Sequence, residues 1–95
     1  MIKALQDIKE ERERQVNQEG WTTEHDDEHT DGSLAKAAAC YARSSPEVHM
    51  YNGPSIWTWP WDDKWWKPKN RRRDLVKAGA LIVAEIERLD RIGGG

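Results

Sequence analysis

The segment RRRDLVKAGALIVAEIERLDR, residues 71–91, decides the fold. Apolar residues recur in it every three or four positions, which is the spacing of one face of an α-helix. They form two seams, one of Leu75, Gly79, Ile82, Ile86 and Leu89, and one of Val76, Ala80 and Val83. A helix that is apolar on two sides contacts more than one neighbour, so we expect this helix at the centre of the protein. Asn70 is its expected N-cap.

Two further helices are predicted before it. Apolar residues at helical spacing predict one over 2–18, and Gly20 ends it. Residues 34–43 predict a second helix whose many alanines allow another helix to approach closely. Residues 21–32 show no periodicity and are predicted to be a loop.

The stretch 44–70 is predicted to be a long loop, because it holds all four Pro and five of the six Trp. A connection of this length in so small a domain is more often functional than idle. We therefore expect residues 1–92 to form one helical domain, followed by a flexible tail over 93–95. The expected fold class is all-α, a small three-helix unit with a long Trp/Pro-rich loop.

The composition excludes several classes of protein. The 95 residues carry a net charge of −2, which does not favour general nucleic-acid binding. No apolar run is long enough to span a membrane, and the charged N-terminus is unlike a signal peptide. The single Cys40 excludes an internal disulfide and a cysteine-based zinc module. We expect a cytoplasmic protein.

The aliphatic core is thin. The chain has 15 Leu, Ile and Val residues and no Phe, although six Trp add apolar surface. A thin core in a short chain favours association of copies. We therefore expect a helical homo-oligomer, formed largely through the helices over 34–43 and 71–91.

Charge is distributed unevenly along the chain. Residues 19–32 hold six carboxylates and no Lys or Arg, whereas residues 61–77 hold seven Lys and Arg against three Asp. These two segments could pair with each other, within one chain or between subunits. The basic segment could instead hold an anionic ligand.

Three stretches carry a resemblance to known proteins: ERERQVNQEGWTTEHDDEHTDGSLAKAAACYA, WPWDDKWWKPK and RRRDLVKAGALIVAEIERLDR. Together they resemble a group of small phage and prophage proteins, similar in layout to MazG-like all-α nucleoside triphosphate pyrophosphatases. The resemblance implies a dimeric or tetrameric helical bundle with a nucleotide pocket, located in an infected bacterial host cell. It also implies Mg²⁺ held by an E-x-x-E pair on one helix and an E-x-x-D pair on the next.

The sequence departs from that metal pattern. The helix over 34–43 contains no carboxylate, and Asp74 is followed three residues later by Lys77, which repels a cation. Glu87 and Asp90 spell E-x-x-D, but near the end of the helix and without a partner pair. Mg²⁺ needs several converging oxygens. We therefore predict no catalytic residues and no cofactor, with Mg²⁺ required only if the chain is a divergent pyrophosphatase.

The Trp-rich loop and the basic run after it predict a nucleotide clamp. Indoles stack on bases, and arginine forks hold phosphates at a helix N-terminus. The candidate stacking rings are Trp57, Trp59, Trp61, Trp65 and Trp66. The candidate phosphate ligands are Lys67, Arg71, Arg72, Arg73 and Lys77, and further candidates for the pocket are Arg12 and Tyr41. The alternative is that the indoles fill the core and the basic run is a solvated face.

The acidic loop contains the candidate metal ligands His25, Asp26, Asp27 and His29. The two histidines are four residues apart and converge if the segment is helical, which suits a transition metal. Asp26, Asp27 and Asp31 could alternatively bind Mg²⁺ carried by a nucleotide. The alternative is an acidic loop that caps the next helix or pairs with the basic segment.

Three functions follow from these patterns. The first is a phage nucleotide-binding protein that sequesters a cyclic or ADP-ribose-type immune signal without cleaving it, and so counters host defence. The second is a divergent Mg²⁺-dependent nucleoside triphosphate pyrophosphatase. The third is a protein-binding inhibitor or adaptor whose Trp loop docks on a host protein.

Overall fold

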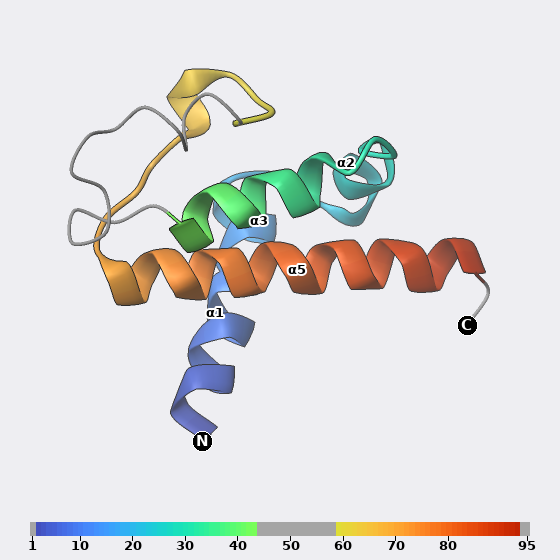
Figure 1. The fold of residues 1–95 in the computed structure, drawn as a ribbon. Helices are drawn as coiled ribbons and strands as arrows, with labels where there is room; N and C mark the ends of the chain where they lie inside the picture. The colour runs from blue at the N-terminus through green and yellow to red at the C-terminus, as the bar shows by residue number, and fades with distance from the viewer. Residues whose placement is uncertain (1, 44–58, 94–95) are drawn as a thin grey trace.

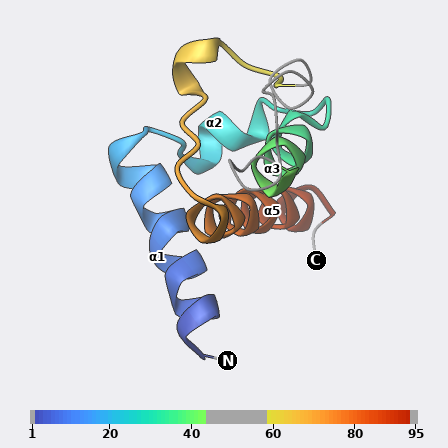
Figure 2. The ribbon, with the colours of Figure 1, turned by 60° about the vertical axis from the view of Figure 1, so that its left-hand side comes forward.

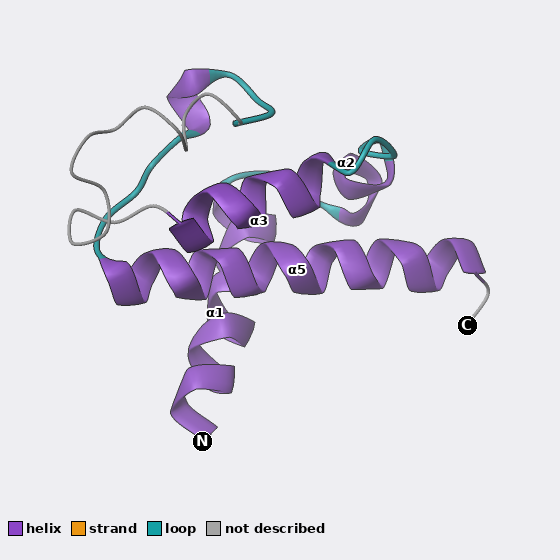
Figure 3. Cartoon of the chain, in the orientation of Figure 1, coloured by secondary structure: helices purple, strands orange, loops and turns teal. Residues whose placement is uncertain are grey.

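The long helix near the C-terminus is the element against which the other helices pack (Figure 1). A computed structural model describes residues 2–43 and 59–93, and within these ranges it contains helices and no strand (Figure 3). The elements are α1 (Ile2–Gln18), α2 (Thr23–Asp27), α3 (Ser33–Arg43), the 3₁₀ turn η1 (Asp63–Trp65) and α5 (Arg71–Gly93). The all-α expectation is confirmed for this part of the chain.

α3 lies along α5, and their contact is the apolar core (Figure 1). The small side chains of Ala37, Ala38 and Ala84 are almost fully buried, so the two helices approach closely. Leu34 and Leu81 fill the space between them, with no exposed surface. The face of α5 that meets α3, formed by Ala78, Leu81 and Ala84, belongs to neither of the two predicted seams.

α1 crosses α5 instead of lying along it, and its N-terminal half extends past α5 (Figures 1 and 2). The crossing brings Ile8 close to Gly79, where a Cβ atom would lie 2.8 Å from Cδ1 of Ile8. Such a distance is shorter than real Cβ contacts, so a larger residue at this position would require the Ile8 side chain to shift.

Charged groups are buried where α1 meets the rest of the chain. Glu11 and Arg12 are 2% and 8% exposed, and Asp26 of α2 is fully buried. Arg12 Nη2 donates to Asp26 Oδ2 at 2.7 Å, and Arg12 Nε donates to Glu87 Oε1 at 3.2 Å. The charged Arg12 interrupts the apolar stripe of α1 because carboxylates of α2 and α5 meet it there.

One element of the fold departs from expectation. The segment 21–32, predicted as a loop, contains α2. Thr22 caps this helix, since its hydroxyl accepts a hydrogen bond from the His25 backbone at 3.3 Å. Five residues make little more than one turn, which is too short to show an apolar period.

The helix ends differ from expectation by one or two residues. α3 begins at Ser33, whose N–H donates to Asp31 Oδ1. α5 continues to Gly93, which was assigned to the tail. Asn70 is confirmed as the cap of α5, because its Oδ1 accepts from the Arg73 N–H at 2.9 Å.

The seam of α5 that begins at Leu75 is largely exposed in the single chain. Ile82, Ile86 and Leu89 are each about half exposed, and Leu75 is 42% exposed. Large aliphatic side chains are also exposed on the free half of α1, at Ile2 and Leu5. Among the described helices, none is long and apolar enough to cross a bilayer.

Candidate functional site

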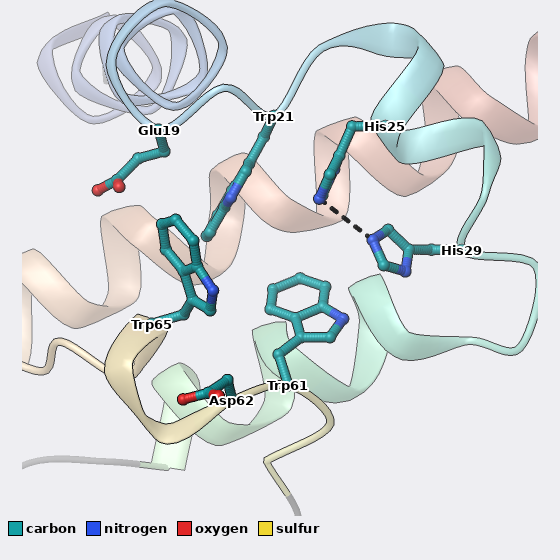
Figure 4. A pocket seen from close by; sticks show the side chains of 7 residues that line it. All are labelled: Glu19, Trp21, His25, His29, Trp61, Asp62 and Trp65. Carbon is teal, nitrogen blue, oxygen red and sulfur yellow. Dashed lines mark hydrogen bonds between the residues drawn. The ribbon is translucent and has the colours of Figure 1, made fainter.

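Five aromatic side chains surround a pocket between α2 and the segment before α5 (Figure 4). This aromatic pocket has a volume of about 270 Å³. Its walls are Trp21, His25, His29, Trp61 and Trp65, and it is also lined by Glu19 and Asp62.

Two turns, one after α1 and one at η1, position these rings. Gly20 adopts a φ of 77°, which ends α1 and turns Trp21 back so that its N–H donates to the Gln15 carbonyl at 3.0 Å. On the other side, Asp62 starts η1, with its carbonyl accepting from the Trp65 N–H at 3.0 Å. Both turns are fixed by backbone bonds, so the rings that follow them are held in place.

The rings meet mostly edge to face. The Trp21 and Trp61 ring centroids lie 5.4 Å apart at 61°, and His29 lies 5.2 Å from Trp61. Trp21 and His25 are instead nearly parallel, with 6° between their planes and 6.2 Å between their centroids. The Trp61 Nε1–H is buried and has no acceptor among the described residues. The pocket therefore offers π-faces and one unused donor.

The two histidines of the pocket point their ring nitrogens at each other. His25 Nε2 and His29 Nε2 are 3.3 Å apart (Figure 4). The other nitrogen of His25, Nδ1, lies 3.5 Å from Asp26 Oδ1. Burial and the neighbouring His25 lower the pKa of His29, so its neutral form is favoured at neutral pH.

A second pocket, rich in positive charge, lies beside the first. This cationic pocket has a volume of about 520 Å³ and is lined by Arg14, Glu19, Lys67, Lys69, Asn70, Arg73 and Lys77. Glu19 also lines the aromatic pocket, so the two cavities meet at this carboxylate. Glu19 accepts from Arg14 at 3.1 Å and from Lys67 at 3.4 Å. One carboxylate thus joins an aromatic cavity to a basic one.

Glu11 orients two of the arginines that line the cationic pocket, Arg14 and Arg73. Its carboxylate accepts two hydrogen bonds from Arg14, at 2.9 and 2.8 Å, and pairs with Arg73. Burial opposes ionisation of Glu11, but the bonds from Arg14 and the charge of Arg73 lower its pKa below the usual value. Burial lowers the pKa of Lys77, whose ammonium donates to the Lys67 carbonyl. The guanidinium groups of Arg14 and Arg73 are therefore held by the buried carboxylate of Glu11.

The predicted clamp residues divide into two groups. Trp61 and Trp65 line the aromatic pocket, and Lys67, Arg73 and Lys77 line the cationic one. The other candidates within the described residues pack or pair elsewhere. Trp57 lies outside the described residues.

Tyr41, Trp59 and Trp66 form a packed aromatic cluster instead of pocket walls. Tyr41 and Trp59 are buried, and the Trp66 ring lies 4.8 Å from Tyr41 and 4.9 Å from Trp59. The Tyr41 hydroxyl accepts from the Lys67 N–H at 3.1 Å and donates to the Trp65 carbonyl at 3.3 Å. Tyr41 therefore anchors the backbone that carries the pocket residues. Burial raises its pKa to about 12.

Three of the predicted arginines point away from both pockets. Arg71 donates to the Ala42 carbonyl and ties α5 to the end of α3. Arg72 pairs with Asp7 on the outer side of α1, at 2.9 Å. Arg12 is buried among Asp26, Glu87 and the Trp21 carbonyl, so the idea that it reaches a pocket phosphate does not fit its position.

Several lining residues were not singled out from the sequence. Trp21 was read as part of a featureless loop, although a Trp directly after a helix-ending glycine is a signal for a packed ring. Glu19 is counted in the acidic segment over 19–32, and neither it nor Arg14 is predicted to line a pocket, because pairs that join distant segments leave no trace in local spacing. Lys69 belongs to the basic run but was not placed in the site.

The carboxylates proposed as metal ligands are engaged by arginines. Asp26 pairs with Arg12, and Asp27 accepts two hydrogen bonds from Arg91, at 3.1 and 2.7 Å. Within residues 2–43 and 59–93, no group of three or more His, Cys, Asp and Glu side chains is placed to hold a metal ion. Of the four candidates, His25 and His29 are the two whose ligating atoms face each other.

The acidic loop and the basic run do meet within one chain, through Lys67 and Glu19.

Comparison of the chain with protein-family models, with curated proteins and with solved structures finds no match in any of the three. The resemblance to MazG-like enzymes and to phage proteins therefore stays a prediction.

Proposed function

We propose that this protein binds a phosphorylated nucleotide, with the base in the aromatic pocket and the phosphates in the cationic pocket. The observation that carries the proposal is that the two pockets adjoin at Glu19. A nucleotide has the same layout, with a flat π-system joined through a sugar to an anion. Each half of the ligand thus meets the surface that suits it.

The base fits the aromatic pocket for two reasons. Stacking of a base on an aromatic side chain contributes roughly 1–3 kcal/mol, and Trp21, Trp61 and Trp65 present such faces. The unused Trp61 Nε1–H also offers a hydrogen bond to a ring nitrogen or carbonyl of the base. Glu19 at the junction is an acceptor for a sugar hydroxyl or an exocyclic amine.

The phosphates fit the cationic pocket because its cations outnumber its single carboxylate. Arginine donates to phosphate with a planar fork, and hydrogen bonds between charged groups are stronger than neutral ones. Arg73 and Arg14 are already oriented by Glu11, so little conformational entropy is lost when an anion binds. Lys67 and Lys69 are exposed and can move onto the ligand.

The test is titration calorimetry of the full chain with linear and cyclic nucleotides. Lys69→Ala should weaken binding by roughly ten- to a hundredfold, the cost of one charge-assisted hydrogen bond. Trp61→Ala should weaken it as well. The matched control is Arg72→Ala, which removes a neighbouring charge that lines neither pocket. Equal losses in Lys69→Ala and Arg72→Ala would show that only general charge attracts the nucleotide.

Catalysis is tested in the same samples. Protein incubated with each nucleotide is heated to release the ligand, which is then chromatographed. Recovery of intact ligand supports sequestration without cleavage, release of pyrophosphate supports the pyrophosphatase alternative, and no retention favours the protein-binding alternative. Phage origin and a host immune signal as the ligand stay predictions from the resemblance.

Self-association is part of the proposal, with a second copy covering the outward seam of α5. Its exposed members Leu75, Ile82, Ile86 and Leu89 are spaced by seven, four and three residues. This is the pattern by which one helix packs against another like itself. Ile2 and Leu5 of α1 add further exposed aliphatic surface.

Light scattering during size exclusion tests the assembly. The native chain should elute as a dimer or a higher symmetric oligomer, and Ile86→Lys should convert it to an 11.0 kDa monomer. Gln18→Lys, on an exposed position away from the seam, is the control and should leave the assembly intact. A monomeric native chain at micromolar concentration would overturn this part of the proposal.

A further inference from the structure

The geometry of the two pocket histidines suits a metal ion. In zinc sites each imidazole nitrogen lies about 2.0–2.1 Å from the metal, and the ligands are arranged tetrahedrally. Two such nitrogens at a tetrahedral angle are separated by about 3.3 Å. His25 Nε2 and His29 Nε2 are 3.3 Å apart, and they face each other (Figure 4). The pair therefore has the spacing of two ligands on one ion.

The surroundings of His25 are those of a metal-binding imidazole. Its Nδ1 faces Asp26 Oδ1 at 3.5 Å, and Asp26 is itself fixed by a 2.7 Å bond from the buried Arg12. A histidine that ligates a metal almost always directs its other nitrogen at a carboxylate or carbonyl. A proton on Nδ1 leaves the Nε2 lone pair directed at His29.

The remaining coordination positions open into the aromatic pocket. Within the described residues the two histidines are not joined by a third ligand, so water or an anion completes the shell. The buried Trp61 Nε1–H lacks an acceptor there, and it lies on the side of its ring that faces His29 (Figure 4). A metal-bound anion in this space would accept that hydrogen bond.

We infer that His25 and His29 form a site for a divalent transition-metal ion of the Zn²⁺, Ni²⁺ or Cu²⁺ type, with an exchangeable water or anion facing Trp61. Imidazole suits these ions, whereas Mg²⁺ prefers carboxylate and water oxygens. The metal would share the aromatic pocket with the proposed base. Its protein ligands belong to one short stretch of chain around α2, so the site needs no nucleotide to form. Metal binding can therefore hold while the proposed function fails, and the reverse.

The experiment is calorimetric titration of the full chain, free of nucleotide and of any polyhistidine tag, with NiCl₂ and ZnCl₂. We expect saturable binding of one ion per chain and no binding of MgCl₂. His25→Ala and His29→Ala should each weaken binding at least as much as the loss of an outer-shell partner does, about 10–100-fold. The matched control is His49→Ala, which removes the third histidine of the chain and should leave the affinity unchanged.

Two results would overturn the inference. One is the absence of saturable Ni²⁺ and Zn²⁺ binding by the native chain, which would make the pair a simple hydrogen bond. The other is a loss of affinity in His49→Ala that equals the loss in His25→Ala and His29→Ala. His25 stacks beside Trp21, so a melting curve accompanies each variant, and His29→Asn replaces any alanine variant that melts early. Quenching of Trp fluorescence by Ni²⁺ gives a second readout, since the His29 ring is 5.2 Å from Trp61.

Discussion

α5 packs against α3 and against α1 in two different ways. Against α3 it buries Ala78, Leu81 and Ala84, and the contact is apolar and close. Against α1 it contributes Arg73 and Glu87, which pair with charged side chains of α1. The first contact excludes water through small side chains, whereas the second depends on every buried charge having a partner.

The difference between these contacts separates stability from function. An apolar contact is non-directional, so it stabilises the fold without fixing any polar group. A buried ion pair adds little net stability, but it fixes where its members lie. Arg14 and Arg73, which line the cationic pocket, are held by Glu11 on the charged side. The arginines of the proposed site are therefore positioned by the charged contact, whereas the apolar contact stabilises the fold that holds them.

The largest expected effect comes from breaking the charged contact. Arg12→Ala leaves Asp26 buried without its guanidinium partner, and removing one member of a buried pair costs about 3–5 kcal/mol of unfolding free energy. Urea denaturation measures the loss. Lys3→Ala, which removes an exposed pair with Asp7, is the control and should change stability by less than about 1 kcal/mol. Similar values for both variants would show that the buried pair is no more critical than a surface one.

A cavity in the apolar contact should have a comparable or slightly smaller effect. Leu81 is fully buried, and Leu→Ala substitutions in cores cost about 2–5 kcal/mol. In the same urea series, Leu81→Ala should be destabilised while Ile92→Ala, at a 65% exposed position, stays near the native value. Nucleotide binding to folded Leu81→Ala should be retained. Loss of binding without loss of stability would contradict the division between the two contacts.

Periodicity predicted the helices of the apolar contact better than the faces that they bury, and it predicted the charged contact poorly. The spacing in α5 and the alanines of α3 predict both helices. The face of α5 that meets α3, around Leu81, lies outside both predicted seams, and the seam that begins at Leu75 is largely exposed. In the sequence, Arg12 is visible only as a charged residue that interrupts the apolar stripe of α1. Its partners lie 14 and 75 residues away, at Asp26 and Glu87, and local spacing carries no information on such pairs.

The sequence predicted the types of residue in the candidate site better than it predicted which of those residues line the pockets. The indoles and the basic run pointed to stacking and anion binding, and Trp61, Trp65 and Arg73 do line the two pockets. Which indoles enter the core depends on tertiary packing, which placed Trp59 on Tyr41 and left Trp61 at a cavity. The convergence of His25 and His29 is predicted only for a helical segment. α2 contains His25 but ends at Asp27, and the two imidazoles meet although His29 lies beyond the helix.

The smallest effect concerns Tyr41, which titrates as a buried group. Burial raises its pKa from 10.0 to about 12, although the hydrogen bond from the Lys67 N–H opposes the shift. The folded state then holds the proton more tightly than the unfolded state. This contribution to stability is fully present below pH 10 and is lost as the pH rises through about 12, a change of roughly 2–3 kcal/mol. Tyrosinate absorbance against pH should show a late transition that is missing in Tyr41→Phe, and the stability of Tyr41→Phe should fall less over this range. A Tyr41 that titrates near 10 would show that water reaches the end of the apolar contact, which would remove the distinction between the two faces of α5.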